Sequence, residues 1–228
     1  MAADFSWSFT TIPVPPLPIT EGPGGPILVV STTTNPFSRY AVEILRAEGL
    51  NEFSARDISQ INADTLNRYD VVILGEMTLS PTNVTDLTNW VIAGGTLISF
   101  KPDNQLATLL GITPAGGTLS NQYLLVNTTS GPGAGIVGQT IQFHGTANQY
   151  NLSGATSLAT LYSSVSTPTA YPAVTSRNVG SNGGKAVAFT YDLARSIVYT
   201  RQGNPAWEGQ KRDGSLVPVR SDDLFFGN

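Results

Sequence analysis

The chain has 228 residues and a formal net charge of −4, from 12 Lys and Arg against 16 Asp and Glu. It lacks the basic excess that neutralises a phosphate backbone, which argues against nucleic-acid binding. With no cysteine and one histidine, disulfides, thiol nucleophiles and cysteine or histidine metal clusters are excluded, and we expect no cofactor or metal. No apolar run reaches the roughly 18 residues of a membrane span.

The two ends of the chain differ from its centre. Residues 5–11 alternate aromatic and hydroxyl side chains, which predicts a β-strand. A lone strand is unstable, so residues 1–11 are expected to be an edge strand or the remainder of a preceding domain. Residues 12–26 are rich in Pro and Gly and predict an extended linker. The folded domain is expected over 27–201, and a tail with apolar residues, 202–228, is expected to pack on it.

Strands and helices are expected to alternate in the first half of that domain. The run Ile27–Val30 is typical of a strand buried on both faces of a parallel sheet. Asn35-Pro36 and Ser80-Pro81 combine an N-cap residue with a first-turn proline. Further strands are expected at 53–58, 71–74 and 97–100, and helices at 38–48, 62–68, 80–93 and 103–110. This order predicts a three-layer α/β domain with a flavodoxin-like, mostly parallel sheet.

The pattern changes after Gly111. Short strands separated by Gly, Ser and Asn are expected at 123–126, 140–143, 157–162, 172–179 and 185–191. Asp192 is then the expected N-cap of a final helix. The second half therefore predicts antiparallel strands added to the sheet.

The segment Tyr69–Phe100, YDVVILGEMTLSPTNVTDLTNWVIAGGTLISF, resembles the class I glutamine amidotransferase-like fold. The likeness is to its non-amidotransferase branch, which includes trehalose-utilisation-type proteins and the amidotransferase-like domain of some β-galactosidases. It implies an amidotransferase-like topology over about residues 27–200. The family's cysteine belongs at the turn after Phe100, where this chain has Lys101-Pro102. Without that thiol, release of ammonia from glutamine is excluded.

A second resemblance concerns the biological setting. FSWSFTT (5–11) is similar to the last strand of bacterial immunoglobulin-like modules. NPFSRYAVEILRAEGLNEF (35–53) and YDLARSIVYTRQGNPAW (191–207) resemble a domain of large exported bacterial proteins, found between immunoglobulin-like modules and a polysaccharide-deacetylase-like region. This implies one module of a secreted, multidomain, extracellular or cell-surface protein, with neighbouring modules and a polysaccharide as partners.

Candidate site residues follow the predicted strands. Ligands of doubly wound sheets bind beyond the carboxyl ends of the strands, where the order of elements places Glu76, Lys101 and Asp103. Glu76 and Asp103 are a candidate carboxylate pair for glycoside hydrolysis, and Lys101 is a candidate ligand for an anion. In the structural alternative, Asp103 caps a helix, Lys101 pairs with an acid and Glu76 is solvated.

Other candidates come from residue type. His144, the only histidine, is a candidate general base, although a lone histidine at a strand end is more often structural. Two further candidate ligand-binding residues, Asn35 and Asp192, follow predicted strands. Arg195 and Trp207 are also candidates, because tryptophan offers an apolar face and arginine a planar fork to a sugar. Alternatively, the arginines and tryptophan fasten the tail through ion pairs and packing.

Three functions stay open at this point. The leading one is a non-catalytic module that binds carbohydrate or acts as a structural spacer. The second is an enzyme acting on a polysaccharide or glycoside through Glu76, Asp103 or His144. The third is a structural domain that self-associates through the exposed edge of residues 5–11.

Overall fold

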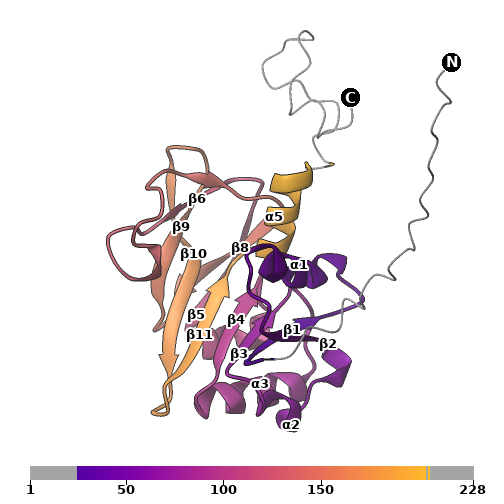
Figure 1. The fold of residues 1–228 in the computed structure, drawn as a ribbon. Helices are drawn as coiled ribbons and strands as arrows, with labels where there is room; N and C mark the ends of the chain where they lie inside the picture. The colour runs from indigo at the N-terminus through magenta and orange to yellow at the C-terminus, as the bar shows by residue number, and fades with distance from the viewer. Residues whose placement is uncertain (1–24, 204, 206–228) are drawn as a thin grey trace, which may run out of the picture.

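A computed structural model describes residues 25–203 and 205 of the chain (Figure 1). In this part, nine strands form one sheet in the order β2-β1-β3-β4-β11-β10-β9-β6-β7. The first five are parallel to one another. Their bounds are β1 Ile27–Ser31, β2 Phe53–Asp57, β3 Val71–Leu74, β4 Thr96–Phe100 and β11 Gly184–Phe189.

Helices cover both faces of the parallel strands. One face packs against α1 (Tyr40–Ala47) and α5 (Leu193–Gln202). The other packs against α2 (Ala63–Leu66), α3 (Pro81–Ile92) and α4 (Ala107–Leu110), and Figure 1 shows α2 and α3 on the side away from α1 and α5. Short 3-10 turns, η1 (Pro36–Arg39), η2 (Ile58–Gln60) and η3 (Asn104–Leu106), lie between these elements.

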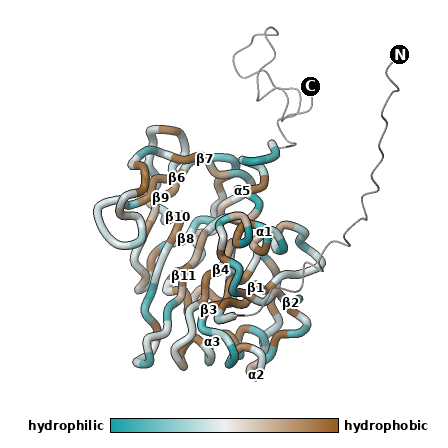
Figure 2. Tube along the Cα trace, in the orientation of Figure 1, coloured by the Kyte–Doolittle hydropathy of each residue, from teal (hydrophilic) through white to brown (hydrophobic). Residues whose placement is uncertain are grey.

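The alternation of side chains along the central strands divides the core in two. In β1, Leu28 and Val30 point toward α3, whereas Val29 points toward α1. All three are fully buried, because successive side chains of a strand point to opposite faces and both faces are covered. Figure 2 shows the hydrophobic residues concentrated along these central strands. The continuous apolar runs of the sequence follow from this double coverage.

The second half adds antiparallel strands beyond β11. They are β10 (Pro168–Val179), β9 (Thr156–Tyr162), β6 (Tyr123–Val126) and β7 (Ile141–Gln142). The 3-10 turn η4 (Gly131–Gly133) lies between β6 and β7. A separate two-stranded sheet pairs β5 (Ile112–Ser120) with β8 (Thr146–Leu152).

The α/β class and the added antiparallel strands are confirmed, while the flavodoxin-like topology stays a prediction. The sequence missed β5 and β8, because β5 contains Pro114, Gly116 and Gly117 and β8 is mostly polar, compositions with low strand propensity. The predictions for residues 1–11, 12–24 and the tail from 206 lie outside the described residues. Within the described residues, no helix has the length and apolar character to cross a membrane.

Candidate functional site

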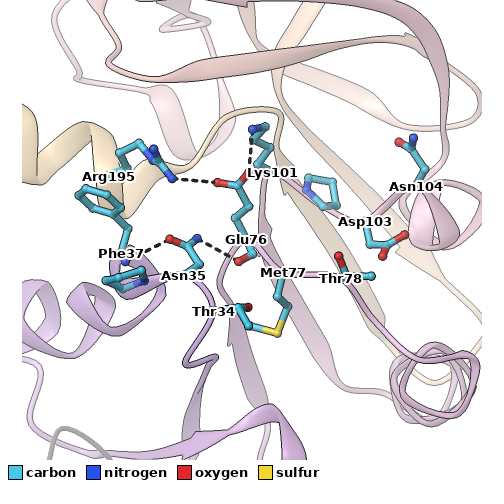
Figure 3. Close-up of a pocket in the computed structure, with 12 residues that line it drawn as sticks. Thr34, Asn35, Phe37, Glu76, Met77, Thr78, Lys101, Asp103, Asn104 and Arg195 are labelled. Atoms are coloured by element: carbon cyan, nitrogen blue, oxygen red, sulfur yellow. Dashed lines mark hydrogen bonds and ion pairs between the residues drawn. The ribbon is translucent and has the colours of Figure 1, made fainter. Parts of the chain in front are cut away.

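A polar pocket of about 520 Å³ lies at the carboxyl ends of β1, β3 and β4 (Figure 3). Its walls come from the loops that follow these strands and from the first turn of α5. The structure thus brings together five of the residues that the sequence singled out, Asn35, Glu76, Lys101, Asp103 and Arg195. Thr34, Phe37, Met77, Thr78 and Asn104 also line it.

Glu76 is at the centre of the charges in this pocket. Its Oε1 lies 2.7 Å from Lys101 Nζ, and its Oε2 lies 3.7 Å from Arg195 Nη2, as the dashed lines of Figure 3 show. The Oε2 atom is buried and has no hydrogen-bond donor within the described part of the chain. The side chain of Glu76 is 25% exposed, so water screens these ion pairs only in part.

Lys101 has an unusual backbone conformation. Its φ of 40° is in the left-handed region, which costs a residue with a Cβ about 1–2 kcal/mol. Its backbone N–H donates to Phe189 O at 2.8 Å, so the end of β4 is tied to β11 while the chain turns sharply. The turn places the Lys101 side chain beside Glu76, and strain of this kind is often found at functional sites.

Asn35 and Asp192 join the loop after β1 to the start of α5. Asn35 Nδ2 donates to Glu76 O at 3.0 Å and to Asp192 Oδ2 at 3.5 Å. Asp192 is 2% exposed and caps α5 by accepting from Arg195 N at 3.1 Å. Burial raises the pKa of Asp192 above its usual value, and the hydrogen bond from Arg195 N opposes that rise.

Arg195 stacks on an aromatic ring. Its Cζ lies 4.4 Å from the centroid of the Phe37 ring, within the range of a cation–π contact. Its Nε lies 3.8 Å from Asp192 Oδ2. Gly145, with a φ of 85°, passes so close that a Cβ there would lie 2.9 Å from Arg195 Cδ. The guanidinium is therefore held at the pocket wall between Phe37, Glu76 and Asp192.

Asp103 has a structural role in this arrangement. Its Oδ1 accepts from Gln105 N at 2.9 Å and caps η3. Its Oδ2 accepts from Leu79 N at 3.0 Å, which ties the loop after β3 to the loop after β4. These contacts match the structural alternative, in which Asp103 is a helix cap.

Two of the predicted site residues within the described part of the chain, Asp192 and His144, do not line the pocket. His144 is 7% exposed, its backbone N–H donates to Ser196 Oγ of α5 at 3.1 Å, and its ring centroid lies 6.2 Å from that of Tyr199. Trp207 lies outside the described residues. Within the described ranges, His, Asp and Glu form no cluster of three or more that could hold a metal ion.

Tyr150 of β8 supports the pocket and was missed by the sequence analysis. Its hydroxyl lies 3.0 Å from Asn104 Oδ1 and 3.3 Å from Pro102 O, so it holds the loop that contains Lys101. Burial raises the pKa of Tyr150. Because β8 is polar and contacts this loop only through the tertiary fold, no local signal in the sequence pointed to Tyr150.

No protein-family model matches the chain, and no curated protein matches it in sequence. Solved structures do match. A β-galactosidase from Bacillus circulans sp. alkalophilus has a TM-score of 0.57 and 13% identity, over 78% of this chain and 31% of its own. An exo-β-1,4-mannosidase from Opitutaceae bacterium strain TAV5 has a TM-score of 0.57 and 15% identity, over 80% of this chain and 34% of its own. A cytoplasmic protein from Salmonella typhimurium LT2 has a TM-score of 0.54 and 13% identity, over 73% of this chain and 87% of its own.

The chain spans about a third of the length of the two glycosidases. At such identities the likeness shows the fold alone. The resemblance to the glutamine amidotransferase-like family is wrong, since the matching structures include β-galactosidase, mannosidase and fucosidase and are not amidotransferase-like. The segment Tyr69–Phe100 encodes a buried strand, a capped helix and another buried strand, which many parallel α/β sheets require. The fold of this chain is therefore one that it shares with domains of glycoside hydrolases.

Proposed function

We propose that this chain is a non-catalytic carbohydrate-binding module of a larger protein, with the sugar bound in the pocket at the carboxyl ends of β1, β3 and β4. The observation that carries the proposal is the pairing of charges in this pocket. Its lining contains two carboxylates, Glu76 and Asp103, and two cations, Lys101 and Arg195, and Glu76 pairs with both cations. A polar pocket with donors, acceptors and no net formal charge suits the hydroxyl groups of a neutral sugar.

The side chains around the paired charges supply suitable groups for such a ligand. Thr34, Thr78 and Asn104 line the pocket with hydroxyl and amide groups. Lys101 and Arg195 are 21% and 32% exposed at their side chains, so each retains N–H groups for a hydroxyl oxygen. Hydrogen bonds with a charged donor are the stronger kind.

The contacts of the two carboxylates favour binding over catalysis. Glycoside hydrolysis requires one carboxyl group to donate a proton and a second to act as base or nucleophile. Both oxygens of Asp103 accept backbone N–H groups, and Oε1 of Glu76 is held by Lys101. Three of the four carboxylate oxygens are thus already engaged with groups of this chain rather than with a ligand in the pocket.

The solved structures support the carbohydrate link. Two of them are a β-galactosidase and a mannosidase, and about a third of each has this fold. A domain of this kind inside a larger carbohydrate-active protein fits the proposed module. Export, an extracellular or cell-surface location and neighbouring immunoglobulin-like modules belong to the same proposal.

A glycan array probed with the full chain tests the proposal, followed by calorimetry and turnover assays on each glycan that binds. We expect saturable binding without turnover. Lys101→Met removes one charged donor, and a lost charge-assisted hydrogen bond of about 1.5–3 kcal/mol corresponds to a roughly 10- to 100-fold weaker affinity. Lys185→Met is the matched control, since Lys185 is exposed and pairs with Thr96 at the opposite end of the strands.

Each result separates the candidate functions. Turnover that is lost in Glu76→Gln would establish the enzyme instead. The absence of glycan binding, with melting temperatures showing that all variants fold, would leave the spacer function and refute carbohydrate binding. Equal losses in Lys101→Met and Lys185→Met would move the ligand away from this pocket.

A further inference from the structure

An apolar trough runs along the face of the sheet that α1 and α5 cover only in part. It consists of two adjoining cavities of about 380 and 450 Å³ that share Val126, Val174 and Phe189. The trough is defined here by six residues, namely Val126, Leu158, Val174, Val187, Phe189 and Ile197. Its sheet residues lie on strands β11, β10, β9 and β6, and Ile197 lies on α5.

Exposed hydrophobic side chains cluster at the rim of this trough. Ile136 and Ile141 line it and are 46% and 45% exposed, and Val137 beside them is 64% exposed. Ile136 and Val137 belong to the connection between η4 and β7, and Ile141 is the first residue of β7. Contiguous exposed apolar surface of this kind marks an interaction site.

The chain leaves α5 at one end of the trough. Thr200 and Arg201, in the last turn of α5, line its cavity. Residues 203–228 follow, and they include Leu224-Phe225-Phe226. From Phe189 the trough extends along β11 to Lys185, a distance of about 13 Å at the rise of a strand. Residues 203–222 reach up to about 66 Å when extended, so the tail is long enough to cover it.

Charge also matches the two parts. Lys185 is an exposed cation that lines the trough at the end away from α5. In the tail, Asp222-Asp223 immediately precede Leu224-Phe225-Phe226. An acidic pair followed by three large apolar residues complements an apolar trough with a cation at its end. By contrast, Gly25, the first described residue, lies beside Glu52, next to β2. This strand is at the opposite edge of the sheet from the strands of the trough, so the trough is closer to the start of the tail than to Gly25.

We propose that Leu224-Phe225-Phe226 of the same chain binds in this trough, with Asp222-Asp223 next to Lys185. The tail would then cover the apolar face of the sheet as a strap that starts at the end of α5. Binding of these three residues removes exposed apolar surface of the trough from water, which favours the contact. The inference is independent of the sugar pocket, which lies at the carboxyl ends of the strands.

A disulfide-capture experiment on the full chain tests the strap. The chain has no cysteine of its own, so an introduced pair reports without background. Ser176→Cys in the trough is combined with Phe225→Cys, in glutathione buffer at low protein concentration. The matched control combines Thr108→Cys with Phe225→Cys, because Thr108 is exposed on α4 against the opposite face. Peptide mass spectrometry measures the intramolecular disulfide.

We expect the Ser176 pair to close about tenfold faster than the Thr108 pair, since docking raises the effective concentration of the two thiols. Adding Lys185→Glu should slow closure of the Ser176 pair and leave the control unchanged. Equal closure rates for the two pairs would overturn the proposal. It would also fail if the disulfides formed between chains, which indicates a second copy, or if Trp7→Cys captured Ser176→Cys faster than Phe225→Cys does.

Discussion

The substitution Gly75→Ala, which adds a single methyl group, should disrupt the pocket through the residues that support it. Gly75 follows β3, and a Cβ there would lie 2.5 Å from Ser38 Cβ and 2.9 Å from Ser38 Cα. Ser38 is 1% exposed, and its Oγ donates to Asn35 O at 2.6 Å and accepts from Thr32 N at 2.9 Å. Gly75→Ala therefore pushes against η1, which begins after Asn35 and contains Phe37.

The size of the effect follows from these distances. Carbon atoms pack best at about 3.5–4.0 Å, so Ser38 has to move by about 1 Å. Overpacking of a tight site costs about 1–3 kcal/mol, and each hydrogen bond of Ser38 that breaks adds about 1 kcal/mol. We expect Gly75→Ala to lower the free energy of unfolding by about 2–4 kcal/mol.

Urea denaturation compares this variant with Gly138→Ala. A Cβ at Gly138 would meet only Thr128 Oγ1, at 3.7 Å, so that control should be neutral or stabilising by up to about 1 kcal/mol. Glycan affinity should also fall in Gly75→Ala, because Asn35 moves with η1. A difference between the two variants below about 0.5 kcal/mol would refute the steric argument.

Three further predictions concern the groups around the pocket. Asp192→Asn should become more stable relative to the wild type as the pH rises above 3.8, because the raised pKa of Asp192 makes its ionisation unfavourable in the folded state. Urea unfolding of both proteins from about pH 4 to about pH 7 measures the difference in their free energies of unfolding. A difference that does not change with pH, or that changes in the opposite direction, contradicts the prediction. Tyr150→Phe should lower the free energy of unfolding by about 1–2 kcal/mol at neutral pH, because its hydrogen bonds are lost. This loss should shrink above pH 10.0, where the raised pKa of Tyr150 destabilises the wild type. Urea unfolding that gives the same loss at both pH values would argue against the prediction. Lys101→Gly should be more stable than Lys101→Ala by about 1 kcal/mol, since glycine adopts the left-handed conformation without strain; equal thermal unfolding of the two variants would show that Lys101 is unstrained.

The local parts of the structure were predictable from the sequence. Apolar runs indicated β1 and β3, and the cap signals at Ser80-Pro81 and Asp192 indicated α3 and α5, which the structure contains. The rule that ligands bind beyond the carboxyl ends of parallel strands placed Glu76 and Lys101 at the same edge. The structural alternative for Asp103 also rested on a local signal, because a cap depends on residues within one turn.

The strands β5 and β8 and the contacts of the pocket followed only from the tertiary structure. Glu76 meets Arg195, and Tyr150 reaches the loop after β4, across separations that no periodicity or cap motif encodes. The sequence by itself determined which segments become strands and helices, because those preferences come from side-chain period and neighbouring residues. The tertiary structure decided which charges pair, how far each is buried and which part of the sheet the helices leave uncovered, because these depend on how distant segments pack.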